Sequence, residues 1–163
     1  MHVTSDQQIR SELERLASTA ANADDLMAQI VKLLRERLPK YNWVGFYMME
    51  KPLAASQPPM LVLGAFEGAP TPHTRIPLNQ GICGAAASSG ATVVVDDVNQ
   101  DPRYLACSLE TRSEIVAPVF AKGEVVGELD IDSHAAAAFG RQDRELVEYC
   151  AALVGKRLEE TRS

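Results

Sequence analysis

Apolar residues recur at helical spacing near both ends of the chain and at strand spacing in the middle. Ile9, Leu13 and Leu16 fall on one face of a predicted helix that begins near Ser5. A second amphipathic stretch follows and ends at Pro39, because proline cannot continue a helix. A third such pattern predicts a helix over about 141–160. Helices are therefore expected at the two ends of the fold.

Between these helices, several short segments are rich in β-branched and aromatic residues. This pattern predicts strands over 42–49, 60–66, 92–95, 113–121 and 124–132, and a short helix over 81–88. Residues 69–77 contain three prolines and are expected to be irregular, and 96–109 is expected to be a loop with a helical turn around 102–107. Strands joined as hairpins form antiparallel sheets.

The predicted order of elements gives an α+β fold with an antiparallel β-sheet. We expect the N- and C-terminal helices to pack on one face and ligand-site loops to lie on the other. A chain of 163 residues fits one domain. That domain, over 1–163, would comprise a helical segment (1–40), the sheet and active-site loops (41–135) and a C-terminal helix (140–160).

Composition and charge narrow the class of protein. Hydrophobic residues make up 46% of the chain and the formal net charge is −6, so the chain can bury a core and carries no basic patch for nucleic acid. No apolar run approaches the roughly 20 residues of a bilayer helix, and the start lacks a signal-peptide pattern. Three widely spaced cysteines do not form a disulfide framework. We therefore expect a cytoplasmic protein without nucleic-acid or membrane partners.

The three cysteines occupy different contexts. Cys107 lies in a polar loop, where a nearby helical turn could lower its pKa; the alternative is a surface thiol without a role. Cys83 lies between Gly81 and Gly84, which permit close backbone approach and suit a ligand site, although tight packing explains the pattern equally well. Cys150 falls on an apolar helical stripe and is expected to be structural. Cys83 and Cys107 could form a redox pair if the fold brings them together.

Acidic residues cluster at one end of the last predicted hairpin. Asp130 and Asp132 lie two residues apart and therefore on one face of a strand, and Glu114 begins the neighbouring strand near Asp132. Three converging carboxylates would bind an ammonium group, and one of them could stay protonated as an acid. The alternative is that the acids are solvated at a strand end.

Two further groups of residues are candidates for a site. His73, Cys83 and Cys107 lack the spacing of a zinc site, so no metal is expected. Trp43 and Tyr47 share one face of a strand, where they pack in the core or line an aromatic pocket.

The chain resembles the free methionine-(R)-sulfoxide reductases, which are small enzymes with the GAF fold. The resemblance covers most of the chain from residue 42 onward. It rests on an ordered set of segments: NWVGFY (42–47), LVLG (61–64), RIP (75–77), GICG (81–84), AC (106–107), SEIV (113–116) and GELDIDS (127–133).

This resemblance implies reduction of free L-methionine-(R)-sulfoxide to methionine, without a bound cofactor. By position, Cys107 corresponds to the nucleophile and Cys83 to a second redox cysteine. A thiolate attacks the sulfoxide sulfur, a sulfenic acid remains, and a second thiol converts it to a disulfide. Thioredoxin or another dithiol would then restore the thiols.

The resemblance also implies the substrate-binding residues. Glu114, Asp130 and Asp132 match carboxylates that bind the substrate, and Glu114 or Asp132 would protonate the departing oxygen. Trp43 and Tyr47 match residues around the methyl-sulfinyl group. The resemblance also implies a homodimer, because GAF domains often dimerise through their terminal helices.

One position departs from the family pattern. The family commonly carries a third cysteine two residues before Arg75, where this chain has His73. Either Cys83 resolves the oxidised Cys107, or an external thiol reduces it directly, or the activity has been lost. Two functions of other classes compete with the reductase: a non-catalytic GAF module that binds a small ligand, and a thiol-based redox sensor.

Overall fold

The computed structural model describes residues 5–50, 54, 56, 59–78, 80–104 and 110–161. In these residues the helices are α1 (Ser5–Thr19), α2 (Ala23–Arg37), α3 (Gly81–Ser89), the 3₁₀ helix η1 (Val98–Gln100) and α4 (Arg141–Thr161). The strands are β1 (Trp43–Glu50), β2 (Met60–Glu67), β3 (Arg75–Pro77), β4 (Val93–Val95), β5 (Ser113–Ala121) and β6 (Glu124–Ser133). They form one sheet of order β3-β2-β1-β6-β5-β4, in which all neighbours are antiparallel.

Local sequence explains how α2 begins and ends. The side chain of Asn22 accepts a hydrogen bond of 2.8 Å from the backbone N–H of Asp25, which caps the first turn. Asp24 and Asp25 place negative charge at this end, where the helix dipole favours it. The helix ends at Arg37, just before Pro39, as the sequence predicts.

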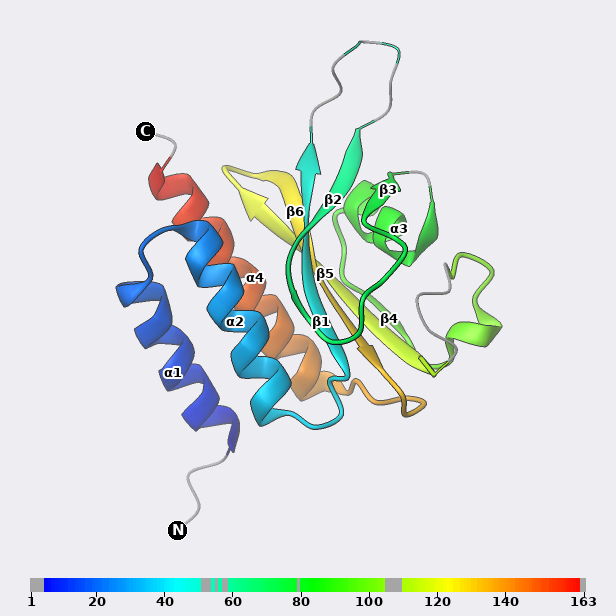
Figure 1. Ribbon diagram of the computed structural model, residues 1–163, viewed down its shortest axis with the longest axis horizontal. Coiled ribbons are helices and arrows are strands. Elements are labelled where there is room, and N and C mark those ends of the chain that lie inside the picture. Colours follow the sequence, from blue (N-terminus) through cyan, green and yellow to red (C-terminus); the bar gives the residue numbers. More distant parts are fainter. Residues whose placement is uncertain are drawn as a thin grey trace.

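The two faces of the sheet bury different side chains. Val44 and Phe46 of β1 and Leu129 and Ile131 of β6 pack into one hydrophobic cluster with α1, α2 and α4. Residues of opposite parity pack into a second cluster with α3. In Figure 1, α1, α2 and α4 lie on one side of the sheet and α3 on the other. The predicted α+β fold, with terminal helices on one face, is confirmed.

One local expectation was wrong, and another is tested only in part. Residues 75–77 are not irregular but form β3, which pairs with β2 at the sheet edge; an edge strand tolerates Pro77 because the missing N–H breaks no internal ladder. The turn expected around 102–107 is described only in part: residues 102–103 form a turn, in which the N–H of Tyr104 donates to the carbonyl of Asp101 at 3.2 Å, and the separate 3₁₀ helix η1 precedes it. The end of the expected turn, 105–107, lies outside the described residues.

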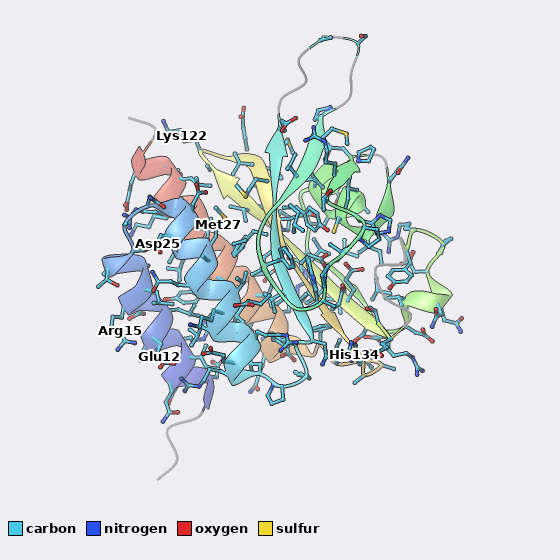
Figure 2. The ribbon with its side chains drawn as sticks, in the orientation of Figure 1. Glu12, Arg15, Asp25, Met27, Lys122 and His134 are labelled. Atoms are coloured by element: carbon cyan, nitrogen blue, oxygen red, sulfur yellow. The ribbon has the colours of Figure 1, made fainter. Side chains whose placement is uncertain are left out.

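Glu12 and Arg15 lie on α1 at the rim of the molecule, whereas His134 lies just beyond the end of β6, across the fold (Figure 2). Within the described ranges, no helix combines the length and hydropathy that crossing a bilayer requires.

Candidate active site

Four acidic side chains lie on the sheet face that α3 covers. Glu128, Asp130 and Asp132 alternate along β6 with residues of the helix-side cluster, and Glu114 of β5 lies directly opposite Asp132. All four are buried, with exposed fractions of 4% for Glu114, 0% for Glu128, 1% for Asp130 and 2% for Asp132. The alternative of solvated acids at a strand end is therefore wrong.

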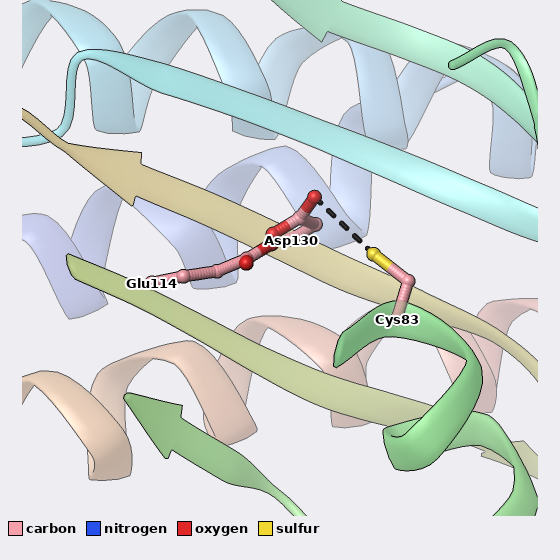
Figure 3. Close-up of side chains that lie close together, drawn as sticks. All are labelled: Cys83, Glu114 and Asp130. Carbon is pink, nitrogen blue, oxygen red and sulfur yellow. Dashed lines mark hydrogen bonds between the residues drawn. The ribbon is translucent and has the colours of Figure 1, made fainter. Parts of the chain in front are cut away.

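Cys83 lies directly over these carboxylates. Its thiol donates a hydrogen bond of 3.4 Å to Oδ2 of Asp130, and Figure 3 shows both side chains and Glu114 pointing toward one another. Burial raises the pKa of the Cys83 thiol well above its usual value, and the negative charges of Asp130, Glu128 and Glu114 raise it further. Cys83 is therefore a protonated thiol at neutral pH.

Burial also raises the pKa values of Asp130 and Asp132. Hydrogen bonds from Glu114 oppose the rise at both carboxyls, and the charge of Asp130 raises the pKa of Asp132 further. One oxygen of each, Oδ1 of Asp130 and Oδ1 of Asp132, has no hydrogen-bond partner among the described residues. Buried carboxylate oxygens are costly without a donor, so the arrangement suits a ligand that carries N–H groups and positive charge.

Sequence reasoning missed Glu128, although the same alternation that groups Asp130 with Asp132 includes it. Neither carboxyl oxygen of Glu128 has a hydrogen-bond partner in the part of the chain that the structure describes. Burial raises the pKa of Glu128 well above its usual value, the adjacent Cys83 thiol lowers it, and the charge of Asp130 raises it. Glu128 is thus a fourth buried acid next to the thiol.

Aromatic side chains form one wall beside the acids. The rings of Trp43 and Tyr47 are 6.2 Å apart, and Trp43 also stacks on Phe66 at 5.8 Å. The indole N–H of Trp43 donates to the carbonyl of Ala69 at 3.0 Å, and the hydroxyl of Tyr47 donates to the carbonyl of His73 at 2.7 Å. These two bonds tie the segment between β2 and β3 to the sheet.

A cavity of about 120 Å³ opens at this wall. Trp43, Pro70, Thr111, Asp132 and His134 are among its lining residues, so it reaches the end of the acidic row. Larger hollows of about 450 Å³, around the end of β5 and α4, and of about 570 Å³, along residues 94–103, lie elsewhere; among the described residues, neither is lined by a predicted site residue. The smaller cavity is therefore the candidate site, because Trp43 and Asp132 line it.

The remaining cysteines, Cys107 and Cys150, and the glycine beside Cys83 lie in different surroundings. Cys107 lies outside the described residues, and Cys150 is fully buried on α4, where burial raises the pKa of its thiol to about 12. Gly84 permits a close backbone approach, but the approaching atom belongs to the chain itself: a Cβ would lie 2.7 Å from the carbonyl oxygen of Leu78. The glycine serves packing of α3 rather than contact with a ligand.

Comparison with known proteins identifies the family. A family profile described as GAF domain matches residues 22–158. The free methionine-R-sulfoxide reductase of Saccharomyces cerevisiae is 37% identical over 137 residues, covering 83% of this chain and 72% of the yeast protein. That of Escherichia coli is 35% identical over 135 residues, covering 83% and 77%.

The structural comparison agrees. The X-ray structure of free methionine-R-sulfoxide reductase from Neisseria meningitidis in complex with its substrate matches with a TM-score of 0.86 at 33% identity, covering 99% of this chain and 95% of that one. The fold and the profile match define a GAF domain. Within that class, the chain belongs to the free methionine-R-sulfoxide reductase family. The resemblance drawn from the sequence motifs is confirmed.

Proposed function

We propose that this protein reduces free L-methionine-(R)-sulfoxide to L-methionine with thiols as the reductant. The observation that carries the proposal is the buried row of carboxylates with unpartnered oxygens, placed between a thiol and an aromatic wall. A free amino acid supplies the ammonium group that such oxygens require. The two enzyme relatives and the substrate complex of the Neisseria protein support the same assignment.

Substrate binding follows from the two sides of the site. Oδ1 of Asp130 and Oδ1 of Asp132 accept hydrogen bonds from the ammonium group, whose positive charge offsets the buried carboxylates. Trp43 and Tyr47 contact the methyl-sulfinyl end through their rings, which suit an apolar and polarisable group. For either acid to act on the sulfoxide, its oxygen must lie within hydrogen-bond reach of Glu114 or Asp132.

Cys107 is the proposed nucleophile. It is three residues from both Tyr104 and Glu110, and three residues span at most about 11 Å. Tyr104 packs against the cluster that contains Cys83, and Glu110 lines the cavity with Trp43 and Asp132, so both flanks of the segment lie at the site. The Cys107 thiolate attacks the sulfoxide sulfur, the oxygen passes to Cys107 and gains one proton from Glu114 or Asp132, and methionine leaves; Cys107 becomes a sulfenic acid.

Cys83 is the proposed resolving cysteine. Its raised pKa makes it a poor first nucleophile in the resting site, which fits a role in the second step. The Cys83 thiol then displaces the hydroxyl of the Cys107 sulfenic acid, forming a disulfide and water. Thioredoxin or another dithiol reduces this disulfide, a step that belongs to a reducing compartment such as the cytoplasm. The homodimer stays a prediction.

An assay with substrate and dithiothreitol tests the function. The protein is incubated with L-methionine-(R)-sulfoxide, and methionine is quantified. Cys107→Ser should lose turnover at least about 100-fold, because serine is not ionised at neutral pH. Cys150→Ser is the matched control and should keep turnover, because Cys150 is buried on α4 away from the acids. Full activity of Cys107→Ser would contradict the mechanism, and no methionine from the wild type would favour a non-catalytic module.

Cys83→Ser separates the two chemical steps. We expect one equivalent of methionine per protein but no thioredoxin-dependent cycling, because the sulfenic acid on Cys107 then has no thiol neighbour. Peptide mapping after one turnover should show a Cys83–Cys107 disulfide in the wild type. A stable Cys107 sulfenic acid beside an unmodified Cys83 would assign resolution to an external thiol.

A further inference from the structure

We propose that the cluster of Cys83, Glu114 and Asp130 is also a binding site for a thiophilic divalent cation, with Zn²⁺ as the best match. The proposal concerns a reversible metal ligand, not a cofactor of the reductase. Nothing in the spacing of these residues along the chain predicts such a site, because they come from α3, β5 and β6.

The distances between the ligand atoms fit a metal ion. One atom of each residue, Sγ of Cys83 and a carboxylate oxygen of Glu114 and of Asp130, lies within 4.8 Å of the others, and all three side chains are buried. Tetrahedral zinc has Zn–S near 2.3 Å and Zn–O near 2.0 Å, which places a sulfur and an oxygen ligand roughly 3.5 Å apart. The observed separation of Cys83 Sγ and Asp130 Oδ2 is 3.4 Å.

The kinds of ligand select the class of cation. A thiolate is a soft ligand that Mg²⁺ and Ca²⁺ do not use, whereas Zn²⁺ accepts sulfur and carboxylate oxygen together. Two carboxylates and one thiolate also fit a tetrahedral zinc site that keeps one position for water or another ligand.

A second observation, the buried oxygens without hydrogen-bond partners, also favours a cation at this site. Oδ1 of Asp130, Oδ1 of Asp132 and both oxygens of Glu128 are buried without a hydrogen-bond partner among the described residues. These side chains are at most 2% exposed, and Asp130 and Glu128 lie beside the Cys83 thiol. Unpaired buried oxygens destabilise the site, and a divalent cation relieves this cost directly or through a bound water.

Zinc would occupy the place that the Proposed function gives to the substrate ammonium group. Asp130 cannot serve both cations at once, so zinc and methionine sulfoxide should exclude each other. Only this competition rests on the proposed function; zinc binding itself does not, and it is measured without substrate.

The test uses the reduced, full-length protein and Zn²⁺ alone, in competition with a chromophoric chelator. We expect one equivalent of bound zinc and a release of protons, because thiol and carboxyl groups lose theirs to bind metal. Cys83→Ser and Glu114→Gln should each weaken binding at least about 100-fold, the upper end of what loss of a merely supporting residue costs. Cys150→Ser should bind as the wild type does.

Two further measurements keep the result unambiguous. Co²⁺ in place of Zn²⁺ should give a thiolate charge-transfer absorption that Cys150→Ser keeps and Cys83→Ser loses. Thermal unfolding without metal checks that each variant is folded. Unchanged zinc affinity in folded Cys83→Ser, loss of binding in Cys107→Ser alone, or no stoichiometric binding by the wild type would each overturn the assignment, whatever the reductase assay shows.

Discussion

At the scale of single residues, Glu128 shows how a buried carboxyl affects both stability and chemistry. Its side chain is fully buried, and neither oxygen has a hydrogen-bond partner in the described structure. The folded protein therefore favours the neutral acid, as the raised pKa of Glu128 indicates. The cost of burying the charge outweighs the stabilisation that the Cys83 thiol gives the ionised carboxylate, so ionisation of Glu128 works against folding.

We predict that Glu128→Gln stabilises the protein in a pH-dependent way. Because the folded-state pKa of Glu128 lies above the unfolded value of roughly 4.3, the wild type loses stability as pH rises above that value, whereas glutamine does not titrate. Each unit of elevation corresponds to about 1.4 kcal/mol. The advantage of the variant in free energy of unfolding should grow by at least about 1 kcal/mol from pH 5 to pH 8.

Urea unfolding at both pH values measures this difference. Glu124→Gln is the matched control, because Glu124 is an exposed residue of the same strand. A constant difference between Glu128→Gln and the wild type at all pH values would contradict an effect of ionisation.

Only those parts of the site that lie on one hairpin could be predicted from the sequence. The pairing of Glu114 with Asp132 follows from one hairpin, and strand alternation places Asp130 on the same face. The contact between Cys83 and Asp130 joins residues 47 positions apart, and no local pattern encodes it. Strand alternation also places Glu128 on this face. It was missed because a single glutamate in an apolar strand is usually an exposed residue.

At the scale of elements, the packing of α4 on β5 depends on one small residue. A Cβ on Gly155 would lie 2.1 Å from the carbonyl oxygen of Phe120, which is backbone and cannot rotate away. Glycine normally costs a helix about 1 kcal/mol relative to alanine. Here it allows the close approach of a helix and a strand.

We predict that Gly155→Ala destabilises the protein by about 1–3 kcal/mol, because the overlap with Phe120 outweighs the gain in helix propensity. Thermal and urea unfolding measure the change. Lys156→Ala, at the next and exposed position of α4, should change stability by less than about 0.5 kcal/mol. A more stable Gly155→Ala variant would show that α4 can shift without cost.

The elements themselves were largely predictable, and the exceptions have physical causes. The long C-terminal helix and the strands of the sheet centre have clear sequence signals, so β1, β5, β6 and α4 match the expected ranges closely, and α2 ends where Pro39 predicts. β3 was missed because it is three residues long, ends in Pro77 and is specified by its pairing with β2 rather than by its own sequence. Edge strands of this kind depend on a neighbour that the chain places 13 or more residues away.

At the scale of the whole molecule, one sheet separates two hydrophobic clusters with different roles in stability and ligand binding. The cluster with α1, α2 and α4 is apolar and holds the fold together. The cluster with α3 surrounds four buried acids, whose low-dielectric setting strengthens their attraction for a cation. A ligand with positive charge should therefore stabilise the whole domain.

We predict that L-methionine, the proposed product, raises the melting temperature and that N-acetyl-L-methionine, which lacks the ammonium group, does not. A ligand at about 100 times its Kd stabilises by about 2.7 kcal/mol, which corresponds to roughly 5–11 °C for a chain of this size. Thermal unfolding with each compound measures the shift. Equal shifts with both compounds would contradict recognition of the ammonium group by Asp130 and Asp132.

The hydrogen bond between Tyr47 and His73 has a consequence for protein engineering. The hydroxyl of Tyr47 donates this hydrogen bond to the backbone carbonyl of residue 73. Because a backbone carbonyl accepts this hydrogen bond, the bond itself does not depend on which side chain stands at position 73, and residue 73 is therefore a point for attaching a spectroscopic label. A fluorophore placed there would report on ligand occupancy while the contact that fixes the wall remains intact.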